Sequence, residues 1–241
     1  MDRMIYLSMA GAKATMQRQD ALAHNLANAS TAGFRAEMTA FRAVPVLGSG
    51  ASTRVYAIES TPGYNAEPGP EQATGRNLDV SLKGNAWLAV QGLDGTEAYT
   101  RAGALDVDAE GLLITKTGRT VLGDGGPITI PPNAQVQIAS DGTISAAVGN
   151  TKPQMVGKLK LVTPEAPLQR GEDGLFRAAD GDLPADPNAR LQDGALEGSN
   201  VSAVETMIAM IAASRQFEQQ MKMVHSAQEK EQTAAKLLSN S

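Results

Sequence analysis

The chain has 241 residues, of which 42% are apolar and 20% charged, with a formal net charge of −5 and no cysteine. This apolar fraction is enough to bury a core, which excludes an intrinsically disordered chain. The acidic balance argues against a nucleic-acid-binding surface. Without cysteine, the chain has no disulfides, thiolate metal ligands or cysteine nucleophile.

Targeting and membrane segments are not expected. The opening Met1-Asp2-Arg3 contains an acidic residue, and no apolar run of signal-peptide length precedes Lys13 and Arg18. No stretch reaches the ~20 apolar residues that span a bilayer. We therefore expect a soluble protein without membrane insertion, which leaves the cytoplasm, if at all, without a cleaved secretory signal.

Proline and methionine divide the chain into three zones. All 12 prolines lie in the middle of the chain, whereas Met155 is the one methionine of ten between residues 43 and 196. Proline-free, Met-rich ends are typical of helices, and a Gly/Pro-rich middle is typical of strands and turns. We therefore predict an α+β protein with an N-terminal helix and linker at 1–42, an all-β domain at 43–196 and a C-terminal helix at 197–241.

The first helix is predicted over residues 4–28 from a repeat that alternates steps of four and three, the spacing of a coiled-coil seam. The helix is expected to end within the polar, Gly-containing segment 28–33. Its seam consists of Ile5, Met9, Ala12, Met16, Gln19, Ala23 and Leu26.

The second helix is predicted over residues 201–238, with Ser199 or Asn200 as its N-cap. At 1.5 Å per residue it is about 57 Å long, more than a compact domain of this size covers. Part of the apolar face of this helix is therefore expected to pack on the first helix or on a neighbouring subunit. An ordinary helical hairpin within a monomer is the alternative. The seam consists of Val204, Met207, Ile211, Ser214, Phe217, Met221 and Val224.

The middle of the chain consists of short apolar runs separated by Asp-Gly, Glu-Gly and Gly-rich turns. No segment of helical length interrupts them, which argues against a parallel βαβ sheet. We expect a sandwich, a barrel or an irregular β-domain. The runs are 55–58, 78–82, 87–91, 99–101, 112–114, 128–130, 136–138 and 155–162.

The charge is concentrated in this middle part. Residues 43–196 carry 12 basic and 18 acidic groups, whereas residues 1–42 carry five and three, and residues 197–241 carry four and five. The near-neutral ends are therefore the more suitable association surfaces.

Motifs for catalysis or cofactor binding are not apparent. The sequence contains no phosphate-binding loop or dinucleotide fingerprint, and His24 and His225 have no second ligand at helical spacing. Residues 180–186 resemble a calcium loop only loosely, because the glycine and glutamate at its sixth and twelfth positions are missing. Asn28 and Asn200 fit the glycosylation pattern, but each fits a helix end better. We expect no enzyme activity, cofactor, metal or small-molecule substrate.

Three segments together resemble the family of flagellar basal-body rod and hook proteins. Residues 23–35, AHNLANASTAGFR, are similar to the family's N-terminal motif, and residues 196–201, LEGSNV, to its C-terminal motif. Residues 74–123 resemble its β-domain. Two departures are His24, where the family usually has asparagine, and Ala86-Trp87-Leu88, where it usually has Gly-Phe-Phe.

The resemblance implies a structural subunit of the rod that crosses the bacterial periplasm. Such subunits leave the cell through the flagellar type III apparatus, stack helically with their terminal helices inside, and transmit torque from motor to hook. The opening residues and the segment 41–46 look most like a proximal-rod member. The implied partners are other rod subunits, copies of the same chain, and the export apparatus in transit.

The expected interface residues come from the two seams and the two terminal motifs. Gly33 is expected to have a positive φ, Phe34 to be an anchor, and Arg35 to meet a neighbouring carboxylate. The full set is Ile5, Met9, Met16, Asn25, Leu26, Asn28, Gly33, Phe34, Arg35, Leu196, Glu197, Ser199, Asn200, Val201, Val204, Met207, Ile211, Phe217, Met221 and Val224.

The residues alone leave two other classes open. A secreted carbohydrate-active or adhesive β-protein would need a groove of aromatics or paired carboxylates, for which Trp87 and four tyrosines offer little. A cytoplasmic helical adaptor or chaperone would not require export.

Overall fold

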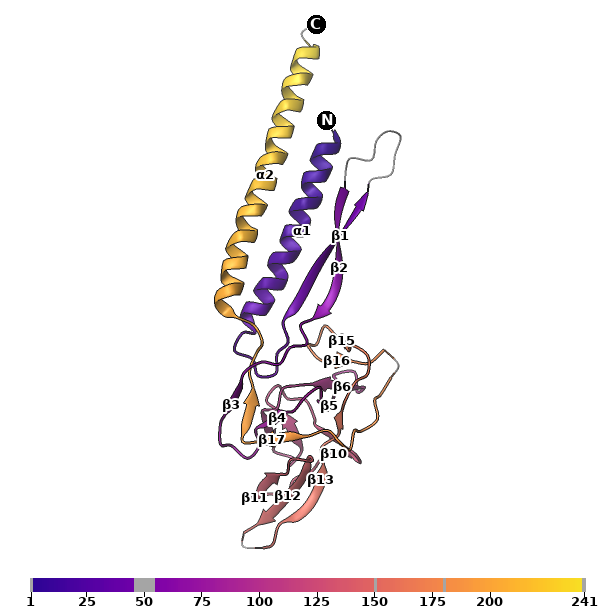
Figure 1. The fold of residues 1–241 in the computed structure, drawn as a ribbon, viewed down its shortest axis with the longest axis vertical. Helices are drawn as coiled ribbons and strands as arrows, with labels where there is room; N and C mark the ends of the chain where they lie inside the picture. Colours follow the sequence, from indigo (N-terminus) through magenta and orange to yellow (C-terminus); the bar gives the residue numbers. More distant parts are fainter. Residues whose placement is uncertain (1, 46–54, 150, 180, 240–241) are drawn as a thin grey trace. The chain divides into compact units, whose positions relative to one another are not determined.

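The computed structural model describes residues 2–45, 55–149, 151–179 and 181–239, and the chain divides into two units (Figure 1). The helical unit comprises Met1–Ala29, Ala36–Asn65 and Val201–Ser241, and the β-unit comprises Ser30–Arg35 and Ala66–Asn200. The predicted α+β class, with paired terminal helices and a central β-rich region, is confirmed. Residues 43–65, which the sequence-based boundaries assign to the β-domain, lie in the helical unit.

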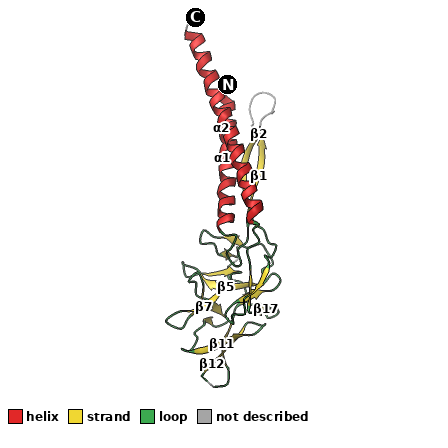
Figure 2. Ribbon diagram, turned by 90° about the vertical axis from the view of Figure 1, so that its left-hand side faces the viewer, coloured by secondary structure: helices red, strands yellow, loops and turns green. Residues whose placement is uncertain are grey.

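The helical unit has three layers, with helix α1 (Asp2–Ala27) between helix α2 (Ala203–Ser239) and an antiparallel hairpin (Figures 1 and 2). The hairpin is formed by β1 (Glu37–Pro45) and β2 (Val55–Tyr64), and the Asn65 amide closes its base by donating to the Ala36 carbonyl at 2.8 Å. Neither helix, as far as the structure describes them, is long and apolar enough to cross a membrane.

Helix α1 is buried on two faces because it has a neighbour on each side. Ala12 is buried on the face toward α2, where a Cβ at Gly11 would lie 3.1 Å from the Gln220 side chain. On the face toward the hairpin, Asn25 donates to the Glu37 carbonyl at 2.9 Å and accepts from the Glu37 amide at 2.7 Å. Small and polar side chains on both faces let the three layers approach closely.

Helix α2 meets α1 through a row of mainly small residues, and not through its predicted seam alone. Thr206, Ala213 and Val224 are buried, whereas Val204, Met207 and Ile211 are exposed. The predicted N-cap was wrong: the Ser202 carbonyl accepts from the Thr206 amide at 2.9 Å, and the Ser202 hydroxyl accepts from the Glu205 amide at 3.4 Å. The described residues of α2 that are buried or half-buried are Ala203, Thr206, Ala209, Met210, Ala213, Phe217, Gln220, Val224 and Ala227.

The β-unit is an irregular assembly of small antiparallel sheets. The largest sheet has the strand order β14-β5-β6-β16-β15, and a second has the order β11-β12-β13. Four two-stranded pairs complete the unit, β3 with β18, β4 with β17, β7 with β8, and β9 with β10. The strands are β3 (Glu71–Ala73), β4 (Val80–Leu82), β5 (Trp87–Gln91), β6 (Glu97–Thr100), β7 (Leu105–Val107), β8 (Leu113–Thr115), β9 (Leu122–Gly123), β10 (Gly126–Pro127), β11 (Ala134–Ile138), β12 (Thr143–Val148), β13 (Gln154–Lys158), β14 (Leu161–Val162), β15 (Gln169–Arg170), β16 (Phe176–Arg177), β17 (Leu191–Asp193) and β18 (Ala195–Glu197).

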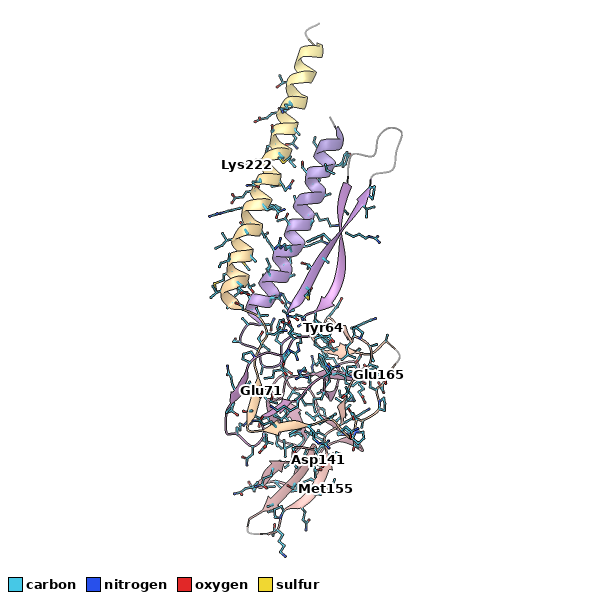
Figure 3. The ribbon with its side chains drawn as sticks, in the orientation of Figure 1. Tyr64, Glu71, Asp141, Met155, Glu165 and Lys222 are labelled. Atoms are coloured by element: carbon cyan, nitrogen blue, oxygen red, sulfur yellow. The ribbon has the colours of Figure 1, made fainter. Side chains whose placement is uncertain are left out.

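Two predicted runs differ from the observed strands. Residues 128–130 form no named strand, and Thr129 makes only an isolated bridge with Leu112. Residues 155–162 divide between β13 and β14. Met155 on β13 is largely exposed (Figure 3), whereas Leu161 and Val162 of β14 are buried.

The β-unit has one large apolar core, and the only tryptophan of the chain is buried beside it, between the core residues Ala86 and Leu88 in sequence. Trp87 is 1% exposed, and its ring packs on Phe176 at a centroid distance of 4.7 Å. Nearby, the Tyr99 hydroxyl donates to Glu97 at 2.9 Å and accepts from the Leu183 amide at 2.6 Å. Burial raises the pKa of Tyr99 well above its usual range. Trp87 fluorescence is therefore a selective probe of this unit.

Replacing Gly103 by alanine tests how tightly this core is packed. A Cβ at this position would lie 1.7 Å from the Val80 carbonyl oxygen. We expect Gly103→Ala to lower the free energy of unfolding of the β-unit by about 3 kcal/mol or more, measured by urea titration of Trp87 fluorescence. Gly125→Ala is the control, because its Cβ would meet nothing within 4 Å. Equal effects of the two substitutions would contradict the packing.

Candidate assembly site

The two terminal sequence motifs meet inside the β-unit. The segment Ser30–Arg35, which follows α1, lies beside the residues that follow β18. The Gly33 amide donates to the Glu197 carbonyl at 2.8 Å, and the Asn200 amide donates to the Phe34 carbonyl at 3.3 Å. The fold therefore joins residues that the sequence holds far apart.

A buried ionic cluster of Arg35, Arg101 and Glu197 holds this junction. One Glu197 oxygen, Oε1, lies 2.8 Å from Arg35 Nη2, and the other, Oε2, lies 2.7 Å from Arg101 Nε and 2.5 Å from Arg101 Nη2. All three side chains are 2–3% exposed. Removing one partner of such a buried pair costs about 3–5 kcal/mol, because a charge is left inside without its counter-ion.

Backbone carbonyls hold the Arg101 side chain in place. Its Nη1 donates to the carbonyls of Gly84 at 2.9 Å and Ala86 at 2.7 Å, and its Nη2 donates to the Leu82 carbonyl at 2.7 Å. The cluster holds two positive charges and one negative charge, and these carbonyl dipoles offset part of the excess. Arg101 therefore links the β4–β5 connection to the terminal motifs.

Gly33 lets the backbone pass close to Arg101. Its φ is 71°, which confirms the predicted positive φ. A Cβ there would lie 2.3 Å from the Arg101 carbonyl carbon, so the position excludes any side chain for steric as well as conformational reasons.

Phe34 is buried and held by a cation–π contact. The Arg170 guanidinium carbon lies 4.5 Å from the centre of the Phe34 ring. Arg170 Nη1 also donates to the Arg35 carbonyl at 3.1 Å, which fixes the segment from a second side. Phe34 is thus the anchor that the sequence predicted.

The segment that follows the hairpin joins the same cluster. Arg35 Nη1 donates to the Glu67 carbonyl, which also accepts from Asn200 Nδ2 at 2.8 Å. The Gly69 amide donates to Glu197 Oε1 at 3.1 Å. Residues 30–35, 66–70 and 195–200 are therefore held by one carboxylate and its partners. The chain crosses between its two units only at the ends of these segments.

Glu71, labelled in Figure 3, lies on strand β3. It is opposite Glu197 in the register of the β3–β18 pair. Lys83 Nζ donates to both Glu71 carboxylate oxygens at 2.7 and 2.8 Å, and the Ser81 hydroxyl donates to one of them at 3.1 Å. The hydrogen bond from Lys83 is the main cause that lowers the pKa of Glu71. The two acidic side chains of the pair thus have separate cationic partners.

The other predicted interface residues lie on the helices or next to the cluster. Asn25 binds Glu37, and Asn28 Nδ2 donates to the His24 carbonyl at 2.9 Å, as a helix end requires. Ser199 is buried, and Leu196 and Val201 are half-buried. On the helices, Met9, Met16, Val204, Met207, Ile211 and Met221 are exposed, Ile5, Leu26 and Phe217 are half-buried, and Val224 is buried.

Sequence reasoning missed Arg101, Glu67 and Arg170 as members of the site. Arg101 lies in a segment that resembles the family's β-domain, and the available signal was an arginine between a buried strand and Gly103. Glu67 participates through its carbonyl oxygen, for which the sequence carries no signal. The expected carboxylate partner of Arg35 is Glu197 of the same chain.

The arrangement of charged side chains holds three chain segments together, which is a structural role. Among the described residues, no group of three or more His, Asp or Glu side chains is placed to hold a metal ion. Asp180, part of the loosely calcium-like segment, lies outside the described residues. A hollow of about 390 Å³ adjoins the large sheet, and the Lys160 and Glu97 side chains that line it bind each other at 2.7 Å.

Replacing Gly33 by alanine tests the junction. We expect Gly33→Ala to lower the free energy of unfolding of the β-unit by about 3 kcal/mol or more, since it combines a positive φ with a backbone clash. Gly75→Ala is a matched control, because Gly75 has a φ of 70° but open space around its Cβ. The control should cost about 1 kcal/mol by urea titration. A Gly33→Ala cost no larger than the control would contradict the close approach.

Comparison with known proteins gives matches over most of the chain. Residues 5–35 match the family model for flagella basal body rod proteins, and residues 81–146 match the D1 domain of the flagellar hook proteins FlgE/F/G. Residues 192–237 match the C-terminal model of the flagellar basal body rod FlgEFG proteins.

Curated relatives match over their whole length. The chain is 48% identical to the flagellar basal-body rod protein FlgF of Salmonella typhimurium, with both chains fully covered, and equally to that of Escherichia coli. It is 30% identical to FlgF of Caulobacter vibrioides, over 99% of this chain and 98% of the relative. The resemblance to the rod and hook family expected from the sequence is confirmed, including the likeness to its FlgF members.

Proposed function

The chain belongs to the family of flagellar basal-body rod proteins, and from this we propose how it acts as a structural subunit. It is a non-enzymatic component of the basal-body rod and assembles with other rod subunits. We propose further that it lies in the proximal rod and is exported by the flagellar type III apparatus. In the rod, its terminal helices pack on copies of itself and on other rod subunits, and the array transmits torque to the hook.

The observation that carries this proposal is a pair of exposed apolar stripes on the terminal helices. On α2, Val204 is 68% exposed and Ile211 is 56% exposed, although both are large apolar side chains. Several large apolar side chains exposed on one face of a helix are typical of a protein–protein interface. The α1 stripe consists of Tyr6, Met9 and Met16, and the α2 stripe consists of Val204, Met207, Ile208 and Ile211.

The α2 stripe faces away from α1. Ile211 precedes the buried Ala213 by two residues, which places it about 200° around the helix from that contact. The helical unit therefore uses one face of α2 for itself and leaves the opposite face for another subunit. The Tyr6 stripe of α1 likewise lies between its two buried faces, on a third side.

Burial of these stripes supplies the assembly energy. Each large apolar side chain contributes about 1.5–3 kcal/mol when it is fully buried. A helical array repeats a heterologous contact that does not close, so the α1 stripe of one subunit need not meet the α1 stripe of the next. The near-neutral charge of residues 197–241 lets such surfaces approach without strong repulsion.

Torque reaches the β-unit through the segments that the ionic cluster holds. Load on α1 enters at Ser30, and load on α2 enters at Asn200, because the chain crosses between the units there. Arg35, Arg101 and Glu197 tie both entry points together. Because the chain belongs to the rod family, we no longer favour the two alternatives that the residues alone left open, a carbohydrate-active or adhesive β-protein and a cytoplasmic adaptor or chaperone.

The α2 stripe is tested by Ile211→Asp. We expect this subunit to keep its fold, because Ile211 is exposed, and to be lost from purified basal bodies, because a buried carboxylate opposes the contact. Circular dichroism of the subunit and immunoblots of basal bodies measure the two effects. Gln216→Asp, at another exposed position of α2, should assemble normally. Normal incorporation of the Ile211→Asp subunit would contradict the proposal that the α2 stripe is an interface.

The division between helices and β-domain is tested by deleting residues 205–241. The deletion keeps the ionic cluster, so we expect native Trp87 fluorescence and an unchanged urea midpoint of the β-unit. Incorporation into basal bodies should be lost, because the α2 stripe is missing. Loss of both the native Trp87 signal and incorporation would mean that α2 belongs to the core of the β-unit.

A further inference from the structure

We propose that the β-unit can fold only when the negative charge of Glu197 is present. Glu197 has to contact both Arg35 and Arg101, which precede it in the chain. The inference starts from burial. Arg35, Arg101 and Glu197 are each 2–3% exposed, and each Glu197 oxygen contacts a different guanidinium group. Both arginines thus bind the same carboxylate.

Closure without Glu197 would bring two cations together in a dry interior. Guanidinium groups stay charged in proteins, so neither arginine can relieve the repulsion by losing a proton. The Leu82, Gly84 and Ala86 carbonyls that bind Arg101 offset its charge only in part, because they are dipoles and not ions. The folded unit therefore requires a full negative charge at position 197.

The residue that carries this charge, Glu197, lies near the C-terminal end of the β-unit's sequence. Arg35 lies in the segment by which the chain first enters the β-unit, and Glu197 lies in its last strand. Strand β17 pairs with β4, and β18 pairs with β3, so the last two strands complete the first two. Local folding cannot close the unit before residue 197 is present.

The direction of chain delivery turns this topology into an order of events. A ribosome releases the N-terminus first, as does any channel that is entered by the N-terminus. Both arginines then emerge before their carboxylate, and the β-unit stays open until almost all of it has been delivered. This property belongs to the β-unit alone, and its use during export rests on the proposed function.

The charge requirement is tested with Glu197→Gln in the full chain, which keeps the size of the side chain. We expect either loss of native Trp87 fluorescence or a urea midpoint lower by more than about 1 M. Asp193→Asn is the matched control: it removes the same charge from an exposed position on β17 and should shift the midpoint by less than about 0.3 M. Equal midpoints for Glu197→Gln and wild type would overturn the proposal.

A double variant separates charge from packing. Arg35→Met combined with Glu197→Gln leaves one buried cation in place of two, so we expect its midpoint to lie above that of Glu197→Gln alone. If the loss came only from packing, the second substitution would lower the midpoint further. A double variant no more stable than Glu197→Gln overturns the proposal.

The order of folding is tested on ribosome-bound chains, stalled with either Arg190 or Ile211 just outside the exit tunnel. We expect the β-unit to resist protease only in the longer chain, and to lose this resistance when the longer chain carries Glu197→Gln. Resistance in the shorter chain, resistance of the longer Glu197→Gln chain, or no resistance in the longer wild-type chain would each overturn the proposal.

Discussion

The Glu197 carboxylate is the contact on which the β-unit depends. Its two oxygens hold Arg35 and Arg101, Oε1 also accepts from the Gly69 amide, and the Glu197 backbone carbonyl accepts from the Gly33 amide. A buried ion pair of this kind adds little net stability compared with an apolar packing of the same volume, but it is intolerant of a missing partner. It therefore specifies one arrangement of the connecting segments. For the proposed role in transmitting torque, a fixed arrangement matters more than a deeper energy minimum.

The helical unit separates internal from external contacts by side-chain size. Small or polar residues such as Ala12, Thr206 and Ala213 face the neighbouring helix, which brings the backbones close. Larger apolar residues such as Met207 and Ile211 face outward. A long helix gains most of its stability from packing of its apolar face, and large apolar residues of α2 such as Met207 and Ile211 do not pack on α1. The proposed assembly contacts would therefore add to the stability of both helices.

The sequence was sufficient for features that repeat or that follow local rules. Both helices, the Asp-Gly turns and the positive φ of Gly33 follow from spacing and residue type. Strand β1 was missed because its side chains are largely exposed, so it lacks the alternation of a half-buried strand. The cluster needed three-dimensional information: Arg101 and Glu197 are 96 residues apart, and no local pattern pairs them. The large apolar residues of α2 predicted a seam, but only the neighbour's position shows which face is covered.

The closed base of the β1–β2 hairpin has a consequence for how such proteins evolve. The Asn65 amide binds the Ala36 carbonyl, so the hairpin leaves and rejoins the chain at one point. A change in the number of residues between β1 and β2 therefore leaves the chain outside Ala36 and Asn65 connected as before, and the entropic cost of a longer loop grows only slowly with length. Related chains of this fold can therefore differ at the hairpin while the segments on either side of it keep their own contacts.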